Sequence, residues 1–314
     1  MIPLVHPGTW GELHRWDNAR VRTDAGLRVG SLCMTDIRIT FLGTGAGNCI
    51  HRAHTAIVLD CADGTRVLID TGSGNGALRH GATLNMLAEH FELLLLTHRH
   101  LDHMGGLPFL QGQRTLVNPE APPIKVYSTE ESLIWARRLC QVSRPAFQID
   151  QDAAYTPEGH AVFRWHPTQE GERLQLGPTT HACPFAVDHL PGAVGWRIES
   201  DGIAIVFSGD TKFSPTLPEW ARNARLLIHE ALSTERDRER TYRRGHSTAA
   251  DAGRAAALAD VSELIITHID SPFHLDTRPL LDEARQHFDG PVSVANDLSQ
   301  VTIEAGVPET LSDR

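Results

Sequence analysis

Cysteine is scarce and scattered in this sequence. The five cysteines show no C-x-x-C spacing: Cys33, Cys49, Cys61, Cys140 and Cys183. An odd number without paired spacing argues against a disulfide framework and against a zinc site built on thiolates. We therefore expect these cysteines to be small, buried apolar side chains.

The sequence also lacks a long apolar run. No stretch approaches the ~18 apolar residues that a membrane-spanning helix requires. The N-terminus lacks the basic-then-apolar order of a signal peptide. These absences predict a cytoplasmic protein without a membrane partner.

Cations are fewer than anions, whereas histidine is abundant. Lys and Arg number 29 against 39 Asp and Glu, so the formal net charge is −10. This balance disfavours general adhesion to nucleic acid but is compatible with a local basic patch. Several of the 18 histidines follow predicted strands, at positions where binding sites are commonly built.

Length and composition favour one large α/β domain. The chain has 314 residues, of which 41% are hydrophobic, enough to fill a substantial core. Residues 1–35 carry many charges without a sustained period, although Met34 opens a segment, MTDIRITFLGTGAG, that looks like a fresh protein start. We expect 1–35 to be an extension of unknown role, 36–305 a single domain and 306–314 a tail.

Hydrophobic patterning predicts hairpins mixed with strand-then-helix units. A helix is expected from a capping box, Ser128–Glu131, toward Cys140, and an alanine-rich helix over 248–259. Strands are expected at 37–42, 55–59, 66–69, 93–96, 124–127, 196–199, 203–207, 226–228 and 264–267. This mixture predicts two mixed sheets covered by helices rather than one doubly wound parallel sheet.

The glycine loop Gly43-Thr44-Gly45-Ala46-Gly47 superficially suggests dinucleotide binding. Its spacing is G-x-G-x-G, and the residues that follow do not predict a helix whose N-terminus could hold a pyrophosphate. We interpret the loop as a tight turn close to a site.

The segment LLLLTHRHLDHMGG carries the strongest chemical signal. His98 and His100 leave a buried strand on the same side, and a turn can bring Asp102 and His103 to a second point nearby. Imidazole and carboxylate are ligands that suit Zn²⁺, with Mn²⁺ or Fe²⁺ as alternatives. The alternative is that His98, His100, Asp102 and His103 are neighbours on an exposed polar loop without a common ligand.

Two pairs of ligands cannot complete two metal sites, so further ligands must come from other strand ends. Three candidates are His189, which precedes a predicted hairpin, Asp210, which closes that hairpin, and His268, which ends a predicted strand. Asp70 ends a strand in the same way. Any one of these histidines taken alone is more often a core or surface residue than a ligand. Their joint pattern favours a metal site.

These motifs resemble the metallo-β-lactamase superfamily, and more narrowly ribonuclease Z. The H-x-H-x-D-H element carries the broad match, and FLGTGAG, His229-Glu230-Ala231 and Gly245-His246-Ser247-Thr248 carry the narrower one. The resemblance spans Phe41 to about Asp297. It implies a four-layer αββα sandwich and a homodimer.

The resemblance also implies a dinuclear site. One zinc would be held by His98, His100 and His189, a second by Asp102, His103 and His268, and Asp210 would bridge them. Asp70 would orient the metal loop. The second motif residue, His100, is not the glutamate of the di-iron redox branch.

His246 and Glu230 would complete the catalytic set together with Asp102. An imidazole held by a carboxylate can give a proton to a leaving alkoxide after attack by a metal-bridging hydroxide. The alternative is that His246, with Ser247, only caps the helix at Thr248.

Ribonuclease Z proteins commonly carry a tRNA-binding arm between the residues that match His189 and Asp210, where this chain has only 20 residues. Basic residues do cluster before His246, at Arg236, Arg238, Arg240, Arg243 and Arg244, but acidic residues interleave with them, which favours a self-neutralising surface. The missing arm disfavours tRNA and favours a small-molecule or short phosphodiester or ester substrate.

Three functions are therefore compatible with the sequence. The first is a dinuclear phosphodiesterase or ribonuclease Z-like hydrolase. The second is a hydrolase of lactones, thioesters or other carboxylic esters that uses the same metals. The third is a non-catalytic metal-bound binding protein.

Overall fold

The fold is described from a computed structural model of the chain. The structure describes residues 36–118, 120–143, 149–150, 153–154 and 162–304, with backbone only at 149–150 and 153–154. These residues belong to one compact unit, Met34–Arg314. The predicted extension, 1–35, and the predicted tail, 306–314, lie outside the described residues.

The first large sheet carries the glycine loop and the histidine-rich loop. Its strands, in spatial order, are β16 (Gln300–Ile303), β1 (Ile37–Gly43), β2 (Ala56–Asp60), β3 (Arg66–Ile69), β4 (Leu93–Leu95), β5 (Ile124–Ser128) and β8 (Phe163–Pro167). The strands from β16 to β3 pair antiparallel, whereas β3, β4, β5 and β8 run parallel.

The second large sheet has the same mixed character. Its strands are β15 (Val292–Val294), β14 (Leu264–Thr267), β13 (Leu226–Glu230), β12 (Ile203–Phe207), β11 (Val194–Ser200), β10 (His181–Ala186) and β9 (Leu174–Gln175). Strands β12 to β15 run parallel, and β9 to β12 pair antiparallel. A short hairpin joins β6 (Ile149–Asp150) to β7 (Ala153–Ala154).

Helices connect the parallel strands. They are α1 (Gly76–Thr83), α2 (Leu101–Met104), α3 (Leu107–Val117), α4 (Glu130–Ser143), α5 (Leu217–Trp220), α6 (Arg238–Arg243), α7 (Ala249–Ala259) and α8 (Arg278–Ala284), with single 3₁₀ turns η1 (Ala88–His90), η2 (Glu235–Asp237) and η3 (Ser271–Phe273). None of these described helices is both long and apolar enough to cross a lipid bilayer.

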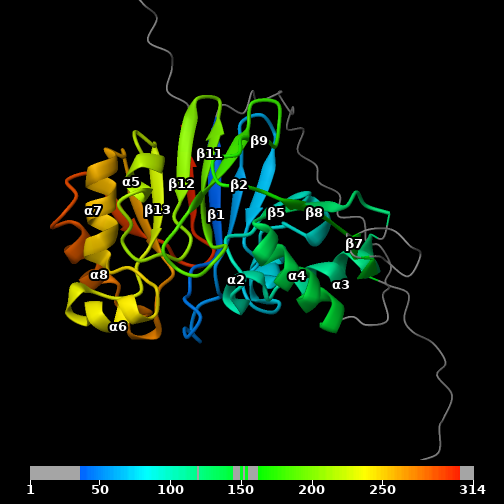
Figure 1. The fold of residues 1–314 in the computed structure, drawn as a ribbon, viewed down its shortest axis with the longest axis horizontal. Helices are drawn as coiled ribbons and strands as arrows, with labels where there is room; N and C mark the ends of the chain where they lie inside the picture. The colour runs from blue at the N-terminus through cyan, green and yellow to red at the C-terminus, as the bar shows by residue number, and fades with distance from the viewer. Residues whose placement is uncertain (1–35, 119, 144–148, 151–152, 155–161, 305–314) are drawn as a thin grey trace, which may run out of the picture. The chain divides into compact units, whose positions relative to one another are not determined.

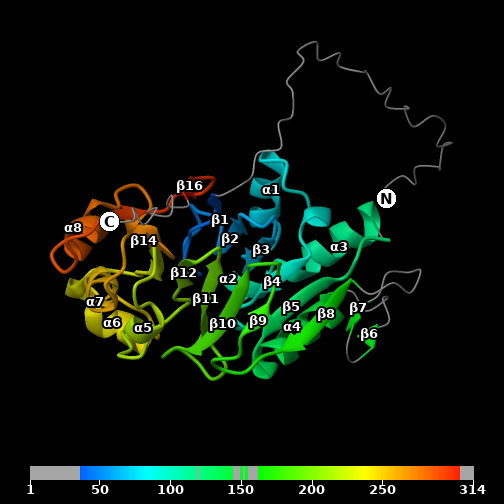
Figure 2. The same cartoon turned by 90° about the horizontal axis from the view of Figure 1, so that it is seen from above.

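Three apolar layers hold the unit together. The central layer, which includes Ile57 and Trp196, lies between the two sheets. A second layer packs α1, α3 and α4 on the first sheet, and a third packs α5, α7 and α8 on the second. Figures 1 and 2 show these helices on the outer faces of the sheets. The two mixed sheets and the αββα layering confirm the predicted fold class.

The predicted strands and both predicted helices occur, with small shifts at their ends. The α4 cap is one residue later than expected, because Thr129 Oγ1, not Ser128, accepts a hydrogen bond from Ser132 N. Ser128 is instead the last, buried residue of β5. The sequence does not predict α1, α3, α8 or several strands, among them β8 and β10. Helices α1 and α8 are only eight and seven residues long, and short segments show few repeats of a helical period.

Leu280 and Leu258 provide a matched test of the third layer. Leu280 of α8 is fully buried, whereas the Leu258 side chain of α7 is 63% exposed. We expect Leu280→Ala to lower the free energy of unfolding by about 2–5 kcal/mol and Leu258→Ala to change it by less than about 0.5 kcal/mol. Equilibrium urea unfolding measures both, and equal small losses would contradict the packing of α8 on the sheet.

Candidate metal centre

The parallel strands bring polar residues from distant parts of the chain to one edge of the molecule. His98 and His100 follow β4, Asp210 follows β12, and His268 follows β14. Carboxyl ends of parallel strands lie at one edge of their sheet, and the two sheets pack face to face across the central apolar layer, so these residues are placed near one another. His189 reaches the same place from the loop between β10 and β11.

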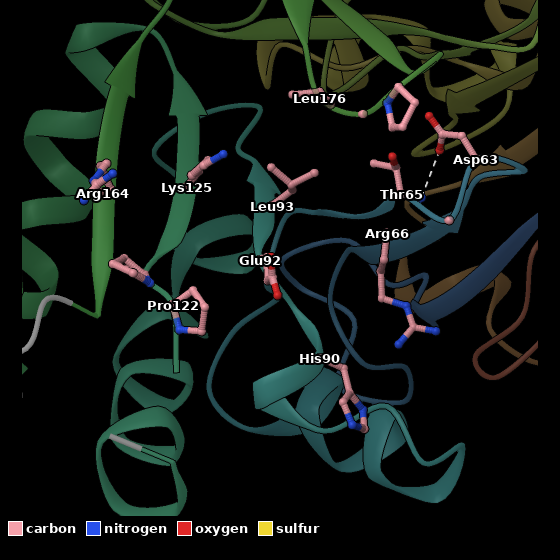
Figure 3. Close-up of a pocket in the computed structure, with 14 residues that line it drawn as sticks. Asp63, Thr65, Arg66, His90, Glu92, Leu93, Pro122, Lys125, Arg164 and Leu176 are labelled. Carbon is pink, nitrogen blue, oxygen red and sulfur yellow. Dashed lines mark hydrogen bonds between the residues drawn. The ribbon is translucent and has the colours of Figure 1, made fainter. Parts of the chain in front are cut away.

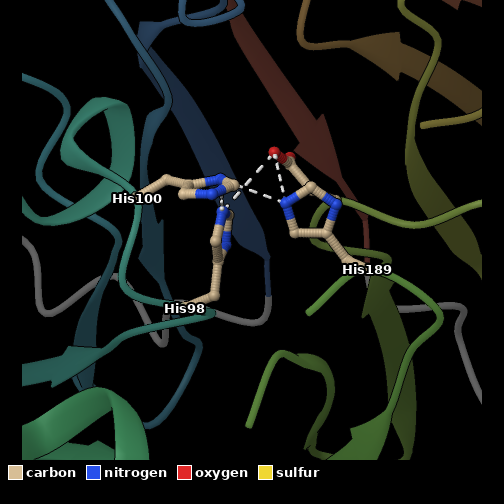
Figure 4. Close-up of side chains that lie close together, drawn as sticks. His98, His100 and His189 are labelled. Atoms are coloured by element: carbon tan, nitrogen blue, oxygen red, sulfur yellow. Dashed lines mark hydrogen bonds and ion pairs between the residues drawn. The ribbon is translucent and has the colours of Figure 1, made fainter. Parts of the chain in front are cut away.

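Three imidazoles form the first group. His100 Nδ1 lies 3.0 Å from His98 Nε2 and 3.1 Å from His189 Nε2. Figure 4 shows the three rings converging on one point. Donor atoms held about 2.0–2.1 Å from one tetrahedral zinc ion would be separated by about 3.3 Å, close to the observed spacing.

A second group lies beside the first. His103 Nε2 and His268 Nε2 lie 3.4 and 3.3 Å from Asp102 Oδ2. They lie 3.2 and 3.4 Å from Asp210 Oδ2. The same Asp210 oxygen is 3.6 Å from His98 Nε2 and 3.9 Å from His189 Nε2, so it is shared between the two groups.

The donor set fits a pair of divalent cations. Among the described side chains, His103 Nε2 and Asp210 Oδ2 are buried atoms without a hydrogen-bond partner. Such atoms are costly to bury unless a ligand satisfies them. A metal ion at each group would satisfy both atoms with the imidazole and carboxylate ligands that zinc, manganese and iron accept.

Asp70 and Thr97 hold the ligand rings in place. His103 Nδ1 donates to Asp70 Oδ2 over 2.7 Å, and Thr97 donates to Asp70 through both its backbone N and its hydroxyl, each over 2.8 Å. The Thr97 hydroxyl lies 3.0 Å from His98 Nδ1. These bonds leave Nε2 of both imidazoles directed at the site, as metal binding requires.

Two of these residues adopt a backbone conformation that side chains rarely accept. Asp70 has φ +55° and His268 has φ +59°, both in the left-handed region. Non-glycine residues in this region are held there by their surroundings and cluster at functional sites. Here the conformation turns each side chain from its strand toward the ligand groups.

Glycines make room for two ligands. A Cβ atom on Gly245, whose φ is +84°, would lie 2.6 Å from His189 Nδ1. The close approach allows His189 Nδ1 to donate to the Gly245 carbonyl over 2.8 Å. A Cβ atom on Gly47 would lie 2.9 Å from Asp102 Oδ2, so the glycine loop is indeed a turn against the site.

The pKa values of the ligand residues reflect how closely they are packed. Burial lowers the pKa of His98 well below its usual value. Burial also disfavours the charged form of His103, but Asp210, Asp102 and Asp70 outweigh it and raise the pKa of His103. A protonated His103 thus compensates the carboxylates without metal, and metal binding would release this proton.

Glu230 and His246 form a third group next to the ligands. His246 Nδ1 donates to Glu230 Oε1 over 3.0 Å, and the same oxygen accepts a 2.6 Å hydrogen bond from Thr211 N. Burial opposes protonation of His246, but the Glu230 carboxylate raises its pKa to about 9. The pair therefore favours a protonated imidazole beside the metal ligands.

The alternative in which His246 and Ser247 only cap α7 is wrong. The cap is Thr248, whose side chain accepts from Asp251 N while the Asp251 side chain accepts from Thr248 N. Ser247 Oγ instead donates to the Thr211 carbonyl over 2.6 Å. His246 is therefore free of a capping role and faces Glu230.

Two segments bear on nucleic-acid binding: the connection between His189 and Asp210, and the basic cluster before His246. The 20 residues between His189 and Asp210 are largely taken up by the β11–β12 hairpin. Arg238 pairs with Glu235, at 2.6 Å. By contrast, Arg236, Arg240 and Arg243 are exposed without an ion pair among the described residues, so the basic cluster is only partly self-neutralised.

The structure thus gathers all ten residues that the sequence singled out. The groups are His98, His100, His189 and Asp210; Asp102, His103, Asp210 and His268; and Glu230 and His246 beside His268, with Asp70 behind His103. Sequence reasoning assigned no contact to Thr97, Thr211 or Gly245. A threonine or glycine at a strand or helix end gives no signal that distinguishes such a contact from ordinary turn structure.

Comparisons with known proteins agree with this geometry. The family described as "Beta-lactamase superfamily domain" matches residues 65–269. Ribonuclease Z of Haloferax volcanii is 28% identical over 312 residues, covering 83% of this chain and 93% of that protein. An uncharacterized protein of Mycobacterium leprae is 31% identical, covering 90% and 93% of the two chains. The metallo-β-lactamase fold protein YhfI of Bacillus subtilis superposes with a TM-score of 0.70 at 19% identity, covering 86% of this chain and all of the other.

Asp70 offers a test of how the ligand rings are held. Asp70→Asn keeps the size of the side chain, and asparagine accepts a positive φ, but the change removes the negative charge of the group to which His103 Nδ1 donates. We expect metal affinity to fall about 10–100-fold, as measured by competition with a chelator and by elemental analysis. Asp260→Asn, at a left-handed residue with φ +51° far along the chain, is the matched control. Unchanged metal affinity in Asp70→Asn would contradict the assignment.

Proposed function

Because this chain belongs to the metallo-β-lactamase superfamily and is related to ribonuclease Z, we propose that it is a dinuclear metal-dependent hydrolase that cleaves phosphodiesters. The observation that carries the proposal is the Glu230–His246 pair, whose imidazole lies 3.8 Å from Asp210, the carboxylate shared by both ligand groups. A hydrolase of this kind needs a proton donor beside its metals.

The proposed ligand assignment follows the two groups. His98, His100 and His189 would hold one ion, and Asp102, His103 and His268 the other, with Asp210 between them. We favour zinc, although the same donors accept Mn²⁺ or Fe²⁺. Two bound divalent ions would supply a water of lowered pKa and a Lewis acid for the ester oxygen.

Side chains near the metal ligands would carry out the proton transfers. His246, protonated through Glu230, would give its Nε2 proton to the departing alkoxide. Thr211 N fixes the Glu230 carboxylate and so fixes the orientation of the ring. Asp102, placed between His103 and His268, would hold the second ion and accept a hydrogen bond from the attacking water.

The surroundings of His246 favour a phosphodiester. Arg240 and Arg244 belong to the segment just before His246 and line a small cavity of about 80 Å³ together with Asp270 and Thr241. Arg244 lies 3.9 Å from Asp270 Oδ2, whereas Arg240 forms no ion pair among the described residues. A guanidinium group without an ion pair recognises phosphate oxygens well. The short connection between His189 and Asp210 favours a small or short substrate over tRNA.

A second candidate is hydrolysis of a lactone, thioester or other carboxylic ester at the same site. The net charge of −10 and the absence of a tRNA arm between His189 and Asp210 support it. Bis-(4-nitrophenyl) phosphate and an acyl lactone, each assayed with added Zn²⁺ or Mn²⁺, distinguish the two. Inactivity on every ester with metal fully bound would instead indicate a binding protein. The homodimer stays a prediction.

His246→Ala is expected to lower kcat by about 10²-fold or more because it removes the proton donor. Metal content should not change, since His246 belongs to neither complete ligand group. Steady-state kinetics with elemental analysis measure both quantities. His287→Ala, which removes an exposed histidine of the same chain, is the control.

Glu230→Gln and the double variant sharpen the same test. If the carboxylate acts only through His246, the double variant will be no slower than His246→Ala, because residues acting as a unit are not additive. Independent, multiplicative losses would contradict the pairing, and loss of metal in His246→Ala would refute its role.

A further inference from the structure

A second recess lies at the opposite end of the parallel strands from the metal-ligand cluster. It is a cavity of about 580 Å³ at the starts of β3, β4, β5 and β8. Leu93, on its wall, opens β4, whereas His98 follows that strand. Five residues of extended chain place the two about 17 Å apart, so the recess is not part of the catalytic centre.

Two cations lie side by side on its wall. Lys125 of β5 and Arg164 of β8 are directly paired across parallel strands, and both are exposed. Figure 3 shows them on neighbouring strands, with Leu176 on the facing loop. Like charges placed directly opposite one another in a sheet are destabilising.

No carboxylate compensates this pair. Among the described residues, neither Lys125 nor Arg164 forms an ion pair, although Arg66 on the far wall pairs with Asp60 over 2.5 Å. The two acidic groups in the recess do not reach the cations. Asp63 accepts hydrogen bonds from the backbone N of Thr65, Thr179 and Thr180, and Glu92 makes no ion pair in the described part of the chain.

The two cations also lower the pKa of a neighbouring side chain, His166. Burial lowers the pKa of His166, and Lys125 and Arg164 lower it further. His166 stacks on Tyr127 with ring centroids 4.8 Å apart, two positions further along the same two strands. Cations without partners therefore border an aromatic pair.

Part of the wall is apolar. Leu93 and Leu176 line the recess beside the polar groups, together with Pro122, Pro123 and Pro178. A volume of about 580 Å³ lies within the usual range for small-molecule sites, ~300–1,000 Å³, in which apolar walls surround a few polar groups.

We propose that this recess binds a small phosphorylated ligand of nucleotide size. The phosphate would lie between the Lys125 ammonium and the Arg164 guanidinium, relieving their repulsion through charge-assisted hydrogen bonds. The remainder of the ligand would pack against Leu93 and Leu176. This site is separate from the proposed function and does not depend on it.

Adenosine monophosphate is the probe, titrated by calorimetry into the full, metal-loaded chain. A phosphate can also bind the metal centre, so we expect two binding events. Lys125→Gln and Arg164→Gln, which keep the aliphatic stems, should each weaken one event about tenfold, and the double variant should abolish it. Asp210→Ala should remove only the other event.

Arg222→Ala is the matched control, because it removes one exposed positive charge elsewhere on the protein. Equal weakening in this control would show a general charge effect and overturn the proposal, as would a single event that the double variant retains. Inorganic phosphate should bind the recess more weakly than the nucleotide. Equal affinity would refute the apolar part of the site.

Thermal unfolding separates a ligand site from a structural one. Without ligand, the double Gln variant should keep or raise the Tm, because it removes a repulsion. With the nucleotide, only the wild type and Arg222→Ala should gain a Tm increase attributable to the recess. A lower Tm of the ligand-free double variant would mark the pair as structural and overturn the proposal.

Discussion

The buried carboxylate of Asp210 is the group around which the site is arranged. Its Oδ2 atom lies within 3.9 Å of one nitrogen of His98, His103, His189 and His268, and makes no conventional hydrogen bond. A buried carboxylate is tolerated only beside positive charge or strong donors. Without metal, protonated imidazole supplies that charge, and a pair of divalent ions would supply it more completely.

The fold surrounds the Asp210 carboxylate with imidazoles by bringing together strand ends from both sheets. His98 and His103 come from the first sheet, whereas Asp210 and His268 come from the second. The apolar layer that includes Ile57 and Trp196 fixes the distance between the sheets. Packing of the core and geometry of the site are therefore coupled, because a shift of one sheet would separate the two halves of the ligand set.

Charge is distributed unevenly over this acidic chain. Carboxylates gather among histidines at the carboxyl ends of the parallel strands, while Lys125 and Arg164 lie unpaired at the amino ends. In the segment just before His246, Arg240 has no ion-pair partner in the described part of the chain, whereas Arg244 is paired with Asp270. Net charge alone thus describes neither end of the parallel strands, because local cations can attract anionic groups to an acidic protein.

Local sequence alone determined the predicted strands and the residues able to bind metal, because hydrophobic alternation and side-chain chemistry are readable along the chain. It also indicated the family through the spacing of His98 to His103. Tertiary structure decided the rest. The contacts of Thr97 and Thr211 and the juxtaposition of Lys125 with Arg164 depend on which strands become neighbours. That choice is made by packing between distant segments, to which no short stretch of sequence is sensitive.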